Sequence, residues 1–191
     1  MSTNSPLRLS RRGFALSALA GLSVTAACGN GVGSNNSAKI DARVDATLNE
    51  MYSIYPNTVG LAQKANGLLV MPLVTEAGLW VGGGYGRGAL RVNGVSVDYY
   101  STAKASAGFQ IGVQQYAHVL FFMTETALAE FRRSSGWVAG GDMEYVFSDK
   151  GDSIATDTTT LRSPVLAVVF GRAGLRVGAT LEGIKYTRIL P

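Results

Sequence analysis

The chain has 191 residues, of which 47% are hydrophobic and 16% are charged, so it is long enough and apolar enough for one domain with its own core. It carries 17 basic and 13 acidic residues, but three of the arginines precede residue 28 in a segment that we expect to be removed. The mature charge is then 14 minus 13, about +1, which excludes general binding to nucleic acid. A single cysteine, Cys28, excludes an internal disulfide.

The amino-terminal segment resembles a bacterial export signal. The Ser-Arg-Arg-x-Phe order at 10–14 is similar to a twin-arginine signal, and the apolar stretch 14–27 ends in small residues directly before Cys28. That arrangement resembles a lipobox, although Thr25 stands where leucine is most usual; the alternative is a stray cysteine before an ordinary cleavage site. Gly29 gives no signal for retention at the inner membrane. We therefore expect an exported periplasmic protein that an acylated Cys28 anchors to the bacterial outer membrane.

Composition then divides the chain into three parts. Residues 1–27 are predicted to be the signal peptide, 28–37 a flexible tether and 38–191 a single domain. Ser37 is predicted to cap a helix in which apolar residues recur every three or four positions, and Val59–Ala65 to form a short second helix. The apolar residues of the first helix are Ile40, Val44, Leu48, Met51 and Tyr55. We expect this helix to pack on a sheet, with a position on lipid as the alternative.

A five-residue unit that begins and ends in glycine recurs four times. Glycines at i and i+4 share one face of a strand, so the units predict related strands, and so many glycines predict sharp bends or close backbone approaches. The units are residues 78–82, 108–112, 136–140 and 174–178. One face of them is predicted to be core: Leu79, Val81, Phe109, Ile111, Trp137, Ala139, Leu175 and Val177.

Other patterns complete the predicted fold. Gly67–Val74 is a short apolar run, typical of a buried strand, in which Pro72 forces an edge or a bulge. The Asn-Gly pair at 93–94 predicts a hairpin with a type I′ turn. Thr124 is expected to cap a helix over Glu125–Arg133. The predicted class is α+β, with a coiled antiparallel β-sheet or small barrel, amino-terminal helices and one inserted helix.

Three patterns resemble functional sites but are better explained by a structural role. The glycine run Gly82–Gly86 contains fragments like a nucleotide loop, but no helical pattern follows it. The acidic residues of 148–157 lack the spacing of a calcium loop. The chain has a single histidine, His118, and no GxSxG nucleophile motif. It also has too few histidines and cysteines to form a zinc site around His118. The carboxylates of Asp142 and Glu144 share one face of a strand, which is typical of a face exposed to solvent. We expect no catalytic residues, no metal, no cofactor and no enzyme activity.

Basic residues near the glycine-rich strands are candidates for binding phosphate, because the planar fork of arginine bonds two oxygens at once. The candidates for contact with an anionic lipid headgroup are Arg172, Arg176, Lys185, Arg188, Arg87 and Arg91. The alternative is that these side chains are ordinary solvated strand residues.

A known family shares the order of these motifs. The segments GLLVMPLVTEAG, VGGGYGRGALRVNG, YYSTAKASAGFQIGVQ, LFFMT, TDTTTL and PVLAVVFGRAGLRVGATLEGIKYTRI, between residues 66 and 191, together resemble the SYLF domain family. Its eukaryotic members bind phosphoinositides and, in yeast, actin. The resemblance implies a non-catalytic domain that binds anionic membrane lipids, here in a bacterial lipoprotein that would not meet actin. A structural lipoprotein that touches the membrane only through Cys28, and has an envelope protein as its partner, is the alternative.

The family's animal members owe much of their phosphoinositide binding to a basic amphipathic segment at the amino terminus. The corresponding helix of this chain is mixed in charge. Its basic residues Lys39 and Arg43 alternate with Asp41, Asp45 and Glu50.

Overall fold

The computed structural model describes residues 36–140, 143–146, 163–171 and 181–191, without the side chains of 79–81, 106–112 and 144–146. All of them belong to one compact unit, Asn35–Pro191. Several predictions lie outside the described residues: the signal peptide, Cys28 and most of the tether, Asp142, the polar loop 148–157, the fourth glycine unit, Arg172 and Arg176.

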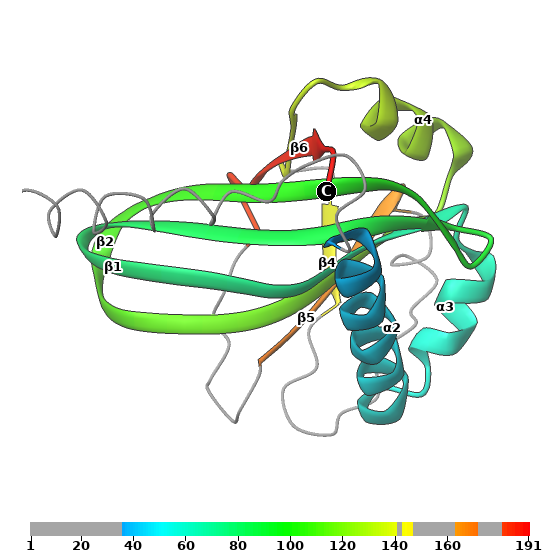
Figure 1. The fold of residues 1–191 in the computed structure, drawn as a ribbon, viewed down its shortest axis with the longest axis horizontal. Coiled ribbons are helices and arrows are strands. Elements are labelled where there is room, and N and C mark those ends of the chain that lie inside the picture. The colour runs from blue at the N-terminus through cyan, green and yellow to red at the C-terminus, as the bar shows by residue number, and fades with distance from the viewer. Residues whose placement is uncertain (1–35, 141–142, 147–162, 172–180) are drawn as a thin grey trace, which may run out of the picture. The chain divides into compact units, whose positions relative to one another are not determined.

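One long β-hairpin dominates the fold (Figure 1). Strand β1 runs over Gly67–Val92 and strand β2 over Val95–Phe122, paired antiparallel. Asn93 and Gly94 join them with φ angles of 51° and 79°, and positive φ at both central residues is what a type I′ turn requires. The predicted hairpin is therefore confirmed. The predicted strand at 67–74 and the first two glycine units are parts of these two strands rather than separate strands.

Strand β1 reverses direction near its middle and packs on itself. A Cβ on Gly88 would collide with the carbonyl oxygen of Val70, and one on Gly86 would lie 2.7 Å from the carbonyl oxygen of Leu73. Both pairs are centred on residues 79–80, inside the first glycine unit. The second unit lies opposite the first in the pairing, so β2 bends at the same place, and Figure 1 shows both strands turning back at the left of the view. The bend that the glycines predicted is confirmed.

Irregularities in the pairing help the hairpin to curl. The register shifts between Met71 and Val74, around Pro72, as the proline predicted. A second shift lies between Gly78 and Trp80, at the bend. Bulges of this kind increase local twist, which suits a strand that must fold back within a few residues.

Two further strands, β5 and β6, pair with β2 along the edge away from β1, and β4 and β3 extend the sheet beyond them. The sheet order is β3-β6-β2-β5-β4, with β1 on the other edge of β2. These strands are β3 (Trp137–Val138), β4 (Met143–Val146), β5 (Val165–Gly171) and β6 (Lys185–Ile189). β6 pairs with the first half of β2 and β5 with the second half, both antiparallel. The α+β class with a coiled sheet is confirmed, but β4 runs parallel to β5, which the antiparallel prediction did not include.

Helices cover both faces of the hairpin. α2 (Asn36–Ile54) and α3 (Thr58–Lys64) pack on one face, and α4 (Glu125–Arg133) packs on the other (Figure 1). α2 includes Asn36, so Ser37 lies in its first turn rather than in front of it. The prediction that the helix packs on the sheet is confirmed, because its apolar residues join a core cluster with alternate residues of β1, β2 and β5.

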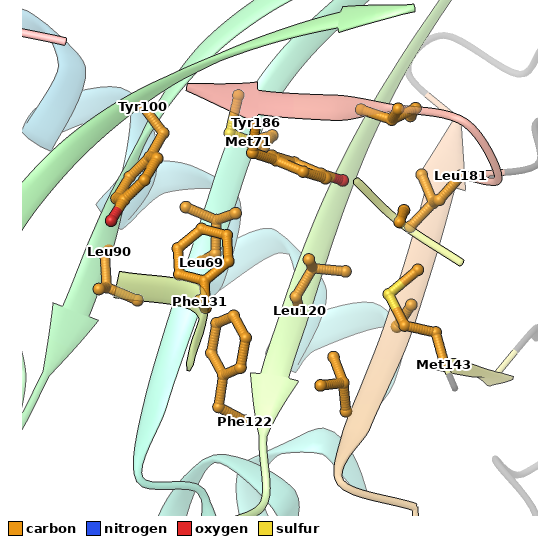
Figure 2. Packing of buried hydrophobic residues seen from close by; sticks show 14 of the residues in the cluster. Leu69, Met71, Leu90, Tyr100, Leu120, Phe122, Phe131, Met143, Leu181 and Tyr186 are labelled. Atoms are coloured by element: carbon orange, nitrogen blue, oxygen red, sulfur yellow. The ribbon is translucent and has the colours of Figure 1, made fainter. Parts of the chain in front are cut away.

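The second core cluster forms under α4 (Figure 2). The Phe131 ring centroid lies 4.7 Å from that of Tyr100 and 4.8 Å from that of Phe122, and Leu128 is also buried. From the third glycine unit, Ala139 is buried and Trp137 packs against the same cluster. These ring contacts fasten α4 and the segment behind it to the hairpin.

Thr124 caps α4 as predicted, and the cap can be tested. Its side-chain oxygen accepts a hydrogen bond from the Ala127 backbone N–H at 3.2 Å. Thr124→Ala should lower the free energy of unfolding, measured in urea, by about 1 kcal/mol because that N–H loses its partner. Thr126→Ala, an exposed change inside the same helix, is the matched control and should cause no loss, since alanine favours a helix. Equal losses in both variants would show that the cap contributes nothing specific.

Candidate functional site

A surface pocket of about 270 Å³ lies between the first two turns of α2 and the folded-back part of β1. Its lining residues are Asn36, Lys39, Ile40, Arg43, Pro72, Leu73, Tyr85, Gly86 and Arg87. Among the described residues, the lining contains three cationic side chains and no carboxylate. A concave site with convergent charges of one sign is suited to a ligand of the opposite sign.

The three cations come from two elements. Lys39 and Arg43 are one helical turn apart in α2 and therefore project from the same side of it. Arg87 stands on β1, where its Nε donates to the Tyr85 hydroxyl at 2.7 Å and its guanidinium carbon lies 5.8 Å from the Tyr85 ring centroid. No ion pair joins any of the three cations to a residue within the described ranges. Their charges are thus available to an anion.

Two of the three acidic residues of α2, Asp41 and Asp45, lie on the other side of the helix from Lys39 and Arg43 and have partners on the hairpin. The Asp41 carboxylate accepts hydrogen bonds from Ser96 Oγ at 2.6 Å and from the Tyr99 hydroxyl at 2.9 Å. Asp45 forms an ion pair with Arg91. Burial, and then the Asp41 carboxylate, raise the pKa of Tyr99, so its hydroxyl remains a donor. The charges of α2 are therefore sorted, with Asp41 and Asp45 toward the hairpin and the two bases toward the pocket.

Of the candidate headgroup residues that the structure describes, only Arg87 lines this pocket. Arg91 is occupied by Asp45 and by the carbonyl oxygen of Gly94, to which it donates at 2.9 Å. Lys185 and Arg188 stand on β6. The structure thus separates the described members of the predicted set rather than bringing them together.

Arg188 also has partners of its own. Its Nε lies 3.5 Å from a carboxylate oxygen of Asp98, and its terminal nitrogen donates to the carbonyl oxygen of Arg132 at 2.8 Å. Arg132 pairs with the same carboxylate at 3.0 Å. Asp98 therefore offsets part of the positive charge around Arg132 and Arg188.

Sequence reasoning missed Lys39 and Arg43 as site residues. Their spacing of four, with Asp41 and Asp45 offset by two, places bases and acids on opposite sides of one helix. That signal was present, but averaging the charge of the whole helix concealed it.

His118, the single histidine of the chain, lies in the interior. Its side chain is fully buried in β2, and its Nε2 lies 2.8 Å from the Tyr186 hydroxyl. Burial, and then the positive charge of Lys104, lower its pKa to about 3. A neutral, buried imidazole of this kind stabilises the packing of β2 against β6.

Within residues 36–140, 143–146, 163–171 and 181–191, no cluster of histidine, cysteine or acidic side chains forms a metal site. Among the helices that the structure describes, none has the length and apolar character needed to cross a membrane.

The fold and the pocket define an α+β domain with a cationic surface pocket. A family model described as Ysc84, Las17-binding protein actin regulator, matches residues 103–188, so the predicted resemblance to the SYLF family is confirmed over these residues. This is a family of binding domains and is not known for catalysis. None of the curated proteins compared with the chain matches it. The family match begins in β2, so the pocket residues of α2 and β1 lie outside it.

Proposed function

We propose that this protein is the non-catalytic, lipid-binding domain of a bacterial envelope lipoprotein, and that the pocket between α2 and β1 contacts the phosphate of an anionic headgroup. The observation that carries the proposal is the convergence of Lys39, Arg43 and Arg87 on one pocket without a carboxylate in its lining. Two arginine forks and one ammonium group match the oxygens of a phosphate. The family match supports a binding domain of this type.

The position of the pocket along the chain supports the same proposal. Asn36, in the pocket lining, follows Cys28 by eight positions. Eight residues span at most roughly 28 Å when fully extended. If Cys28 is acylated, the pocket stays close to the membrane surface that holds the anchor, at a high effective concentration of headgroups.

The proposal predicts binding that does not need the acyl group. The chain from residue 28 with Cys28→Ser should sediment with phosphatidylglycerol vesicles in low salt, stay in solution with phosphatidylcholine vesicles, and be released by high salt as the charges are screened. Lys39→Gln with Arg43→Gln should weaken binding about tenfold. The control, Lys64→Gln with Arg133→Gln, removes the same charge from exposed helix positions outside the pocket and should retain most of the affinity.

The alternative is a structural lipoprotein whose only membrane contact is the acyl anchor. It predicts that no vesicle composition retains the Cys28→Ser chain, whereas the acylated protein partitions into membranes. Mass spectrometry of the membrane-extracted protein tests the anchor itself, because an unmodified chain that lacks Cys28 would exclude it. Equal loss of binding in the pocket variant and in its control would indicate general charge attraction instead of a site.

A further inference from the structure

The strand wall of the pocket is built from two distant parts of β1. Leu73 and the residue before it come from the first half of the strand, and Tyr85–Arg87 come from the second half. They adjoin only because the strand folds back, which brings Gly86 so close to Val74 that a Cβ there would lie 2.8 Å from the valine Cγ2. The pocket therefore exists only while the two halves of β1 stay together.

A buried carboxylate crosses between these halves next to the pocket. The side chain of Glu76 passes over Gly84, where an added Cβ would lie 2.8 Å from the glutamate Cγ. One oxygen of Glu76, Oε1, accepts a hydrogen bond from the Tyr116 hydroxyl at 2.6 Å and lies 3.3 Å from Lys104 Nζ. Lys104 stands directly opposite Gly84 in the pairing of β1 with β2. Glu76 thus joins the first half of β1 to both halves of β2.

The ion pair between Glu76 and Lys104 is largely buried, where an unpaired charge is destabilising. The side chains of Glu76 and Lys104 are only 11% and 12% exposed. Removing one partner of such a pair leaves the other charge buried and uncompensated, which destabilises the arrangement that buried it. Burial, and then the Glu76 carboxylate, raise the pKa of Tyr116 well above its usual range, so its hydroxyl stays a hydrogen-bond donor.

We infer that Glu76, Lys104 and Tyr116 form a clasp that holds the second half of β1 against the first and so positions Arg87 for the anion, three residues after Gly84. The clasp does not touch the ligand; none of its three residues lines the pocket. The inference rests on the proposed function of the pocket. If the wall opens when the clasp is weakened, only the closed fraction of molecules can bind, and the apparent dissociation constant rises in proportion.

The test uses the Cys28→Ser chain and phosphatidylglycerol vesicles at one fixed low salt concentration. Glu76→Gln keeps the size of the side chain but removes its charge, and Tyr116→Phe removes only the hydroxyl. Each should raise the apparent dissociation constant about three- to tenfold at a temperature where the variant is folded. Adding Lys104→Gln to Glu76→Gln removes both charges of the pair together, so the double variant should bind better than the sum of the single losses predicts.

A control must separate a general loss of stability from a specific opening of the β1 side of the pocket. Leu128→Ala is the control for stability, because Leu128 is a buried residue of α4, on the face of the hairpin opposite α2 and the pocket, and its loss should lower stability without changing affinity. If Glu76→Gln and Tyr116→Phe bind as tightly as the parent chain, or if Leu128→Ala weakens binding as much as they do, the inference is wrong. If the parent chain binds no anionic vesicle, the proposed function itself fails.

Discussion

Among the glycine-to-alanine changes at described positions, Gly88→Ala is expected to be the most damaging, lowering the free energy of unfolding by at least about 3 kcal/mol. A Cβ at this position would collide with the carbonyl oxygen of Val70 and lie 2.6 Å from the sulfur of Met71. Neither neighbour can yield easily, because both are fully buried and Val70 is held in its pairing with Val119. Urea denaturation followed by circular dichroism measures the loss.

Gly60→Ala is the matched control for that substitution. Gly60 lies inside α3, and an added Cβ there would have no atom within 4 Å. Alanine is better than glycine in a helix, so this variant should equal or exceed the parent chain in stability by up to about 1 kcal/mol. A loss of less than about 0.5 kcal/mol in Gly88→Ala would mean that the two halves of β1 do not pack as closely as the structure places them.

The parts of the fold that the sequence predicted are those with a local cause. The Asn-Gly turn at 93–94 and the helix Glu125–Arg133 with its threonine cap depend on residues within one turn of each other, so their signals survive without any tertiary information. The amino-terminal helix was predicted for the same reason, since its apolar period is read from neighbours three or four positions apart.

What the sequence could not supply was the length and path of the strands. The glycine units indicated bends, but not that two of them would lie opposite each other in one hairpin and fold it in half. That pairing follows from register, which depends on contacts between residues far apart in sequence. The parallel direction of β4 was not predicted for a similar reason. Its partner β5 begins 22 positions after β4 does. The alternation of side chains is also the same in parallel and antiparallel strands, so the sequence pattern does not distinguish them.

The pocket shows the same limit for a functional site. Lys39 and Arg43 could be placed on one side of a helix, but their availability depends on what Asp41 and Asp45 do. Asp41 is satisfied by Ser96, 55 positions away, and Asp45 is satisfied by Arg91, 46 positions away. Net charge along a helix is therefore a poor measure of the charge that it presents to a ligand.

The stability of the domain is also expected to fall by about 2 kcal/mol between pH 8 and pH 5, because of His118 alone. In the folded state its pKa is lowered to about 3, whereas an exposed histidine in the unfolded chain has a pKa of about 6.5. Below pH 6.5 the unfolded state binds a proton that the folded state does not, so stability is complete above that pH and declines as pH falls toward 3. Urea denaturation at a series of pH values measures the decline.

His118→Gln separates this effect from the titration of carboxylates. The chain has one histidine, so in a protein without a histidine tag no other imidazole titrates between pH 8 and pH 5, and ordinary carboxylates titrate mainly below this range. The glutamine amide can still hydrogen-bond the Tyr186 hydroxyl, yet it binds no proton. The variant should be less stable than the parent at pH 8 but nearly constant down to pH 5. A parent chain whose stability does not change over the same range would show that His118 can gain its proton without leaving the core, contrary to its complete burial on β2.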